Sequence, residues 1–415
     1  MLLRARIVYP GTAPPIADGA VRIYKGRIQE VGRFHELRGD IGEPVQDLGE
    51  SVLLPGLVNA HCHLDYTSFA GLIPRPSGFT KWVQQLISLK SQCSYTEFAS
   101  SWLLGLRQSI DHGATTLCDI EAVPELLPDL LPEVPIRLIS CREIINVRSR
   151  KPSRDLVCEV VSELKTLLPG KHRFGLSPHA PYSTSQDLVR CAAEAALQEE
   201  WIWTIHVGES AEEQQMFEDR RGPMFEWLKS QRDNSDCGST TPFGWLLATG
   251  ALSPRTLIAH ANCITEPEAL AVATAGCHVV HCPKSHAYFS HPKFPLETFR
   301  RAGLNLCLGT DSLASHPSSR QSPAQLNLFS EMQAFLRAFP GASPSEVLSM
   351  ATLHGAEALG LSRETGQITP GLSADLISLP WTGSIDCVAE AIVHHAGSLN
   401  GVMAFGEWVR PPSLP

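Results

Sequence analysis

The sequence predicts an α/β fold, a (β/α)8 TIM barrel joined to a small β-sandwich domain that is built from both ends of the chain. Short apolar runs alternate with longer stretches of helical periodicity through the middle of the chain, and strand-like segments occupy both ends. Alternation of this kind is typical of a parallel sheet wrapped by helices. We therefore expect residues 1–52 and 366–415 to form one composite domain and residues 53–365 to form the catalytic barrel.

Eight apolar runs of strand length supply the predicted barrel. They are Ser51–Ala60, Ala114–Asp119, Ile136–Arg142, Arg173–Pro178, Trp203–Val207, Thr256–His260, His278–Cys282 and Asn305–Gly309. Stretches with apolar residues at helical spacing lie between the runs and predict helices at Trp82–Leu89, Glu97–His112, Leu156–Leu167 and Ser185–Glu199. The polar segment Ser230–Thr241 predicts a loop insertion.

The two ends of the chain share a strand-like pattern. Ala20–Tyr24 and Arg27–Gly32 flank a Lys-Gly turn and predict a hairpin. Near the C-terminus, Ala374–Leu379 and Val402–Val409 predict two further strands. Strands at both ends indicate one small β-domain assembled from the two termini.

Composition excludes several classes of protein. The net charge is −9 and no basic block occurs, which argues against nucleic-acid binding through phosphate neutralisation. No apolar run reaches the roughly 18–20 residues of a membrane span, and no apolar segment follows Met1–Arg6 as in a signal peptide. The 12 cysteines are scattered without a Cys-x-x-Cys pair, which favours free thiols in a reducing compartment, the cytoplasm.

Polar residues follow nearly every predicted strand, at the end where barrels carry their chemistry. The first run ends in His61 and His63, which lie on one face of a strand and can therefore hold one metal ion together. The other candidates at strand ends are Arg142, His179, His206, Glu209, His260, His281 and Asp311. Each residue alone is more typical of a hydrogen-bonded core side chain or a cap, but their joint occurrence predicts a metal site.

In these motifs the chain resembles the amidohydrolase superfamily, and within it the cytosine deaminase and chlorohydrolase branch. The resemblance covers nearly the whole chain. It is carried by Pro55–His63, His206-x-x-Glu209, His260, His281–Ser285, Leu308–Asp311 and the C-terminal segment Pro370–Leu376.

The resemblance implies roles for these residues. His61, His63, His206 and Asp311 would bind one divalent metal ion, most often zinc, with iron as the alternative. Asp311 would also accept a proton from the attacking water. Glu209 would be the proton shuttle, and His260 would orient the water or polarise the substrate. Members with two metal ions often use a lysine after strand four, where this chain has none, so the resemblance favours a single ion.

Four residues are candidates for substrate contact. His179 occupies the position after strand four that contacts substrate in adenosine-type deaminases of this branch. Arg142 either enters the pocket or pairs with Glu143 or Glu121. Trp82 either stacks on a base or belongs to the core. Ser312 follows Asp311 in a stretch that is similar to aminodeoxyfutalosine deaminases.

These observations favour a metal-dependent hydrolytic deaminase that removes the exocyclic amine of an aminopurine nucleoside, either aminodeoxyfutalosine or an adenosine-like molecule. The alternative keeps the metal and changes the leaving group, as in a chlorohydrolase or a cyclic amidohydrolase. A third hypothesis, a non-catalytic scaffold, is disfavoured because all the candidate ligands are present. The expected partner is a small heterocyclic substrate. The resemblance also implies a homodimer, which no feature of the chain itself indicates.

Overall fold

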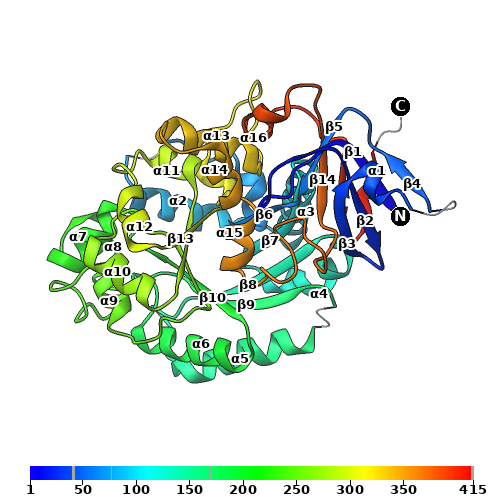
Figure 1. Cartoon of the computed structure of the whole chain (residues 1–415). Helices are drawn as coiled ribbons and strands as arrows, with labels where there is room; N and C mark the ends of the chain where they lie inside the picture. The colour runs from blue at the N-terminus through cyan, green and yellow to red at the C-terminus, as the bar shows by residue number, and fades with distance from the viewer. Residues whose placement is uncertain (40–42, 76, 168–169, 413–415) are drawn as a thin grey trace.

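The computed structural model describes residues 1–39, 43–75, 77–167 and 170–412. The chain forms two eight-stranded sheets. One is a parallel barrel surrounded by helices, and the other is a mixed sheet that both termini contribute, seen in blue and red at one side of the barrel (Figure 1). This arrangement confirms the predicted fold class.

The barrel strands pair in sequence order from β6 to β13, all in parallel. Their bounds are β6 Leu57–Cys62, β7 Ala114–Glu121, β8 Arg137–Ile144, β9 Arg173–Pro178, β10 Ile202–Val207, β11 Thr256–His260, β12 His278–His281 and β13 Asn305–Leu308. The first and last strands meet because the backbone amides of Thr310 and Asp311 donate to the carbonyl oxygen of His61, at 3.0 and 3.1 Å. Each strand from β7 to β13 agrees with a predicted apolar run to within two residues, whereas β6 corresponds only to the second half of the first run.

Most helices follow barrel strands, while α1 Phe34–Leu37 and α16 Val388–Val393 lie between strands of the terminal sheet. The longer ones are α2 Phe79–Lys90, α3 Tyr95–Asp111, α5 Ser153–Thr166, α6 Gln186–Gln198, α7 Ala211–Asp219, α10 Glu266–Thr274 and α13 Leu328–Ala338. The shorter ones are α1 Phe34–Leu37, α4 Leu127–Leu130, α8 Gly222–Leu228, α9 Pro242–Leu247, α11 Pro283–Phe289, α12 Leu296–Ala302, α14 Pro344–Met350, α15 Leu353–Ala358 and α16 Val388–Val393. The four predicted helices are confirmed, and the predicted loop insertion lies between α8 and α9 without regular structure.

The terminal sheet has the order β16-β15-β14-β5-β1-β2-β3, with β4 paired to β1. Its strands are β1 Leu2–Val8, β2 Ile16–Tyr24, β3 Arg27–Arg33, β4 Val45–Asp47, β5 Ser51–Pro55, β14 Leu376–Pro380, β15 Gly401–Ala404 and β16 Glu407–Arg410. The predicted N-terminal hairpin is β2–β3. The segment Val402–Val409 is two strands rather than one, because Phe405 and Gly406 adopt φ of +54° and +78° and turn the chain.

The apolar run predicted as one strand is also divided. Residues up to Pro55 pair with the terminal sheet as β5, and Leu57 begins the barrel as β6. Gly56 lies at the crossing, where a Cβ atom would come within 2.1 Å of the Thr115 hydroxyl oxygen. The absence of a side chain therefore lets the chain pass between the two sheets.

The inside of the barrel is filled by side chains that alternate along the strands. Buried residues from several strands form one apolar cluster: Val58, Ala60, Cys118, Ile120, Ile139, Cys141, Ile202, Leu257, Ala259, Val280 and Cys307. Contact across the interior is close, since the sulfur atoms of Cys118 and Cys141 lie 3.6 Å apart. This cluster identifies which residues of each strand face inward, and it supports the mouth of the barrel from below.

All 12 cysteines are unpaired, and seven of them are buried. Among the described residues, no helix is both long enough and apolar enough to cross a membrane.

A buried ion pair joins the two sheets. The Arg137 guanidinium, at the start of β8, lies 3.1 Å from the Asp375 carboxylate, and both side chains are more than nine-tenths buried. Asp375 also accepts hydrogen bonds from the backbone amide of Phe405 and the hydroxyl of Ser373. Removing one partner of a buried pair leaves the other charge uncompensated.

We expect Asp375→Ala to lower the free energy of unfolding by about 3 kcal/mol, because it removes the buried partner of Arg137 and leaves the partly exposed Glu364, 3.3 Å away, to compensate the charge. Urea denaturation followed by circular dichroism measures the change. The control is Glu159→Ala, which breaks the exposed pair with Lys151 and should cost less than about 1 kcal/mol. Equal losses in the two variants would contradict this role for Asp375.

Candidate metal centre and active site

Three histidines and one aspartate that were predicted as metal ligands meet at the mouth of the barrel. The rings of His61, His63 and His206 lie with their centroids 4.9–5.6 Å apart. The Asp311 carboxylate lies 3.5 Å from Nε2 of His61 and 3.6 Å from Nε2 of His63. All four residues are buried. Strands far apart in the sequence therefore bring these side chains to one point.

A bulge in β6 directs the first two histidines toward the barrel axis. Asn59 pairs with Leu117 and Cys62 pairs with Asp119, so that β6 has one more residue than β7 over this stretch. Val58 and Ala60 face inward, and simple alternation would turn His61 outward. The extra residue reverses the alternation, which places His61 and His63 at the mouth and directs Cys62 away.

At two other strand ends, residues with left-handed backbone conformation direct their side chains toward the barrel axis. His260 and Asp311 have φ of +71° and +56°, values that residues other than glycine seldom adopt. In β11, Ala259 faces inward, so a regular strand would turn His260 away. The left-handed turn instead brings the His260 ring within 5.4 Å of His206, centroid to centroid. Strain of this kind costs of order 1–3 kcal/mol and is concentrated at functional sites.

The buried donor atoms suit a metal ion. Both ring nitrogens of His61 and Nδ1 of His63 are buried without a hydrogen-bond partner. Nδ1 of His206 lies 2.9 Å from the carbonyl oxygen of His179, which leaves Nε2 free to face the cluster. Orphaned buried polar atoms are rare in folded proteins. Three imidazole nitrogens and one carboxylate are also a donor set that zinc prefers, so the residues present fit the implied ion.

The electrostatics of the cluster favour the protonation states that metal binding needs. Burial lowers the pKa of His63 to about 3 and that of His260 to about 4, and it places the pKa of His206 well below its ordinary value. Burial by itself would raise the pKa of Asp311, but the surrounding histidines hold that pKa well below its ordinary value. The imidazole lone pairs are therefore available at neutral pH, and Asp311 is ionised.

The pKa of Glu209 is displaced in the opposite direction from that of Asp311. Glu209 follows β10, and its carboxylate oxygen lies 3.6 Å from Nε2 of His260. Burial, together with the charges of Asp311 and Glu213, raises its pKa well above the ordinary value. Two carboxyl groups with pKa values displaced in opposite directions can act as proton donor and proton acceptor in one site.

A cavity of about 320 Å³ opens over this cluster. Of the residues predicted to contact substrate, it is lined by His179, Trp82 and Ser312. The Trp82 indole donates a hydrogen bond to the carbonyl oxygen of Ala314, and the Ser312 hydroxyl accepts one from the Ala314 amide. These two residues therefore also hold the loop that follows Asp311.

Arg142 is not among the residues that line this cavity. Ile139 and Cys141 face the barrel interior, so Arg142 lies on the opposite face of β8, where its guanidinium donates to the carbonyl oxygen of Glu143. The structure thus does not bring Arg142 to the site. Glu143, predicted only as a candidate ion-pair partner of Arg142, lines the cavity in its place. Alternate residues of a strand share a face, so Glu143, two positions after the inward-facing Cys141, could have been predicted from the strand pattern.

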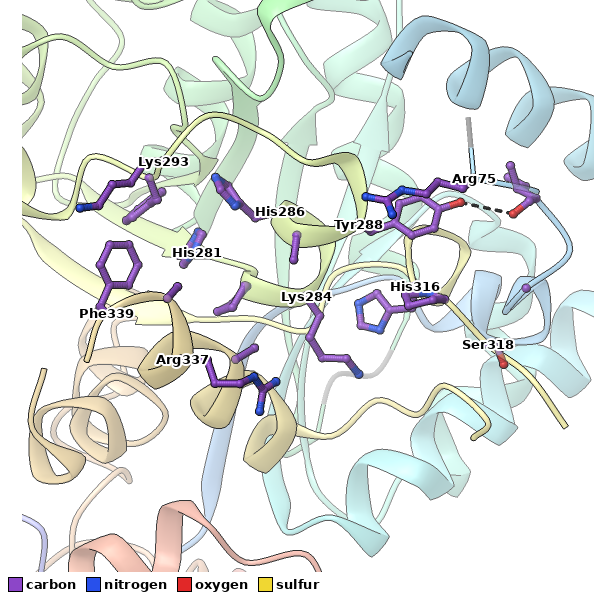
Figure 2. Close-up of a pocket in the computed structure, with 18 of the residues that line it drawn as sticks. Arg75, His281, Lys284, His286, Tyr288, Lys293, His316, Ser318, Arg337 and Phe339 are labelled. Carbon is purple, nitrogen blue, oxygen red and sulfur yellow. Dashed lines mark hydrogen bonds between the residues drawn. The ribbon is translucent and has the colours of Figure 1, made fainter. Parts of the chain in front are cut away.

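A second, larger cavity of about 750 Å³ is lined by His281, one of the candidates at the strand ends, and by none of the residues predicted to bind metal or substrate. Figure 2 shows its walls, which include His281, His286, Lys284, His316 and Arg337. The His281 ring stacks on Phe294 with centroids 3.8 Å apart. His281 lies on the outer face of β12, next to the inward-facing Val280, which explains why it does not join the metal cluster.

The amidohydrolase family profile matches residues 52–409 of this chain. The chain belongs to the amidohydrolase family. The 5-methylthioadenosine/S-adenosylhomocysteine deaminase of Syntrophobacter fumaroxidans is 29% identical over 374 residues, which cover 86% of this chain and 79% of that protein. The aminodeoxyfutalosine deaminase of Deinococcus radiodurans is 27% identical over 377 residues, which cover 86% and 85%. The crystal structure of an adenosine deaminase from Xanthomonas campestris with bound zinc superposes with a TM-score of 0.83 at 22% identity, covering 99% and 93%.

We expect the purified chain to bind about one divalent metal ion, and we expect His61→Ala to lose it, because His61 contributes unpartnered nitrogens at the centre of the cluster. Elemental analysis of the desalted protein measures the metal content. His286→Asn is the control, because His286 lines the second cavity and should leave the content unchanged. Full retention of metal by His61→Ala would contradict the assignment.

Glu331 allows a test of pH dependence away from the metal cluster. Glu331 belongs to α13, is fully buried, and accepts a hydrogen bond from the backbone amide of Lys284 in α11. Burial raises the pKa of Glu331 to about 8. Between its ordinary pKa of about 4.5 and pH 8, the unfolded chain releases this proton while the folded chain retains it, so stability decreases as the pH rises. We expect Glu331→Gln to abolish this loss. The denaturation midpoint of the variant, relative to that of the wild type, should be higher at pH 8 than at pH 5. The same difference between variant and wild type at both pH values would refute the expectation.

Proposed function

We propose that this protein is a metal-dependent hydrolytic deaminase that removes the exocyclic amine of an aminopurine nucleoside as ammonia. The proposal depends mainly on one observation, the buried Glu209 carboxyl group beside His260 and Asp311 in a single cavity. The names of the relatives supply the substrate class, since they include deaminases of methylthioadenosine, S-adenosylhomocysteine and aminodeoxyfutalosine. The cavity of about 320 Å³ has the size of a small-molecule site.

His61, His63, His206 and Asp311 would hold the metal ion, with zinc favoured over iron by their donor set. When bound, the ion supplies Lewis acidity that lowers the pKa of water toward about 7. The remaining steps belong to side chains. Asp311, ionised among the histidines, accepts the proton of the attacking water.

Glu209, protonated because of its raised pKa, donates its proton to the ring nitrogen of the purine. It then takes the remaining proton from the newly added hydroxyl group and passes it to the leaving amine, and the proton held by Asp311 restores Glu209. His260, 3.6 Å from Glu209, orients the attacking water. Ammonia leaves and a carbonyl group remains on the ring. General acid–base catalysis of this kind typically contributes about 10²–10⁴-fold to the rate.

We also make proposals on the location and the domain organisation of the protein. The 12 unpaired cysteines favour a reducing compartment, and we propose the cytoplasm. We also propose that residues 53–365 form the catalytic domain. This proposal is supported by the change of pairing partner at Gly56, since the residues up to Pro55 pair with the terminal sheet and Leu57 pairs within the barrel.

The test measures ammonia release by the zinc-loaded protein from aminodeoxyfutalosine, adenosine, methylthioadenosine, S-adenosylhomocysteine and guanine in parallel. Selective release from one purine nucleoside would support the proposal and identify the substrate. No release from any of the five, with metal present, would refute it and favour the alternative hydrolase of another C–N or C–Cl bond.

We expect Glu209→Gln to retain the metal and lose nearly all turnover, because the amide cannot transfer the proton. Kinetics on the preferred nucleoside, together with metal analysis, measure both effects. Glu218→Gln lies on the exposed side of α7, next to Gln214, and serves as the matched control. Wild-type turnover by Glu209→Gln would refute the role of this residue.

A further inference from the structure

The carboxylate of Glu143 lies in the wall of the active-site cavity. Along β8 the inward-facing positions are Ile139 and Cys141, and Glu143 is the next in that series, at the level where the barrel opens. Its side chain is only 9% exposed, and it lines the cavity together with His179 and Tyr182. A bound substrate would therefore meet this carboxylate.

The acceptor capacity of Glu143 is unused. Its carboxylate makes no side-chain hydrogen bond with the described residues, and its nearest basic neighbour, Nε2 of His179, is 3.9 Å away. That distance exceeds the range of a hydrogen bond. Burial by itself raises the pKa of Glu143, but His179 and Lys90 bring it below its ordinary value, so the group is ionised. A buried carboxylate without donors is costly unless a ligand supplies them.

The neighbouring His179 is held in a fixed position relative to the metal cluster. Its Nδ1 lies 2.6 Å from the hydroxyl oxygen of Ser183, and its backbone carbonyl lies 2.9 Å from Nδ1 of His206. The rings of His179 and His206 are 5.1 Å apart, centroid to centroid. Glu143 and His179 thus form a polar wall one side chain away from the candidate metal ligands.

The chemistry of this wall indicates which part of a substrate it receives. A carboxylate presents two acceptor oxygens, and two adjacent hydroxyl groups present two donors at matching spacing. The lining of the cavity also includes the apolar side chains of Phe79, Trp82 and Leu86, which suit a flat ring. We propose that Glu143 and His179 form a hydroxyl-binding subsite that receives the 2′- and 3′-hydroxyl groups of the substrate's ribose, an inference that rests on the proposed nucleoside deaminase function.

The experiment compares adenosine with 2′-deoxyadenosine and 3′-deoxyadenosine. Hydrogen bonds to a charged group correspond to about a 10- to 100-fold effect, so the wild-type kcat/KM should fall by that factor when either hydroxyl is removed. Glu143→Ala should lose a similar factor with adenosine, chiefly through KM, and should no longer distinguish the three nucleosides. Glu143→Gln should recover part of the preference, because its amide oxygen still accepts one hydrogen bond.

The control is Glu121→Gln. Glu121 is a buried glutamate on the neighbouring strand β7, where it bonds the Val123 amide, and it does not line the cavity. This variant should keep the wild-type preference for adenosine. A purely structural role of Glu143 predicts instead that Glu143→Ala lowers activity equally with all three nucleosides, and that result would overturn the proposal.

A binding measurement separates this inference from the proposed function. Dissociation constants of the three nucleosides for the Glu209→Gln protein, measured by calorimetry with and without Glu143→Ala, report on the subsite without turnover. If the wild type deaminates none of them, the choice of adenosine as substrate fails, while weaker binding of the deoxy forms that depends on Glu143 would still support the subsite. Equal affinity for all three nucleosides would overturn it.

Discussion

The carbonyl oxygen of His61 is the point on which this structure depends. It accepts the backbone amides of Thr310 and Asp311, and these two hydrogen bonds close the last strand onto the first. The same contact places the Asp311 carboxylate beside the His61 ring. Gly309 makes the approach possible, because a Cβ atom there would lie 2.7 Å from the His61 carbonyl oxygen. Closure of the barrel and assembly of the candidate metal site therefore depend on the same backbone contact.

A second level of organisation is electrostatic. The site buries several ionisable groups in a small volume, and burial acts on them in opposite directions. It favours the neutral form of His63, His206 and His260 and the protonated form of Glu209, while the histidines keep Asp311 ionised. Proton donor and proton acceptor thus differ by environment rather than by chemical type. Glu143, whose carboxylate makes no side-chain hydrogen bond with the described residues, adds a further ionised group to the wall of the cavity.

The larger elements follow from local rules. Apolar runs of five to ten residues separated by helical periodicity predicted all eight barrel strands, because each strand is buried on both faces. Strand ends were harder to interpret, since a polar residue there faces either the barrel axis or the helices. The prediction for Arg142 and the omission of Glu143 have this common cause. Their positions differ by one residue, and one residue reverses the face of a strand.

The sequence by itself determined the fold class, the order of the strands and the set of candidate ligands, because these depend on periodicity and residue type. Only the tertiary structure decided which side chains converge. The bulge in β6 turns His61 and His63 inward, and left-handed backbone does the same for His260. His281, on regular β12, faces a different cavity. Bulges and left-handed turns arise from pairing with neighbouring strands that are distant in sequence, so the local pattern does not contain them.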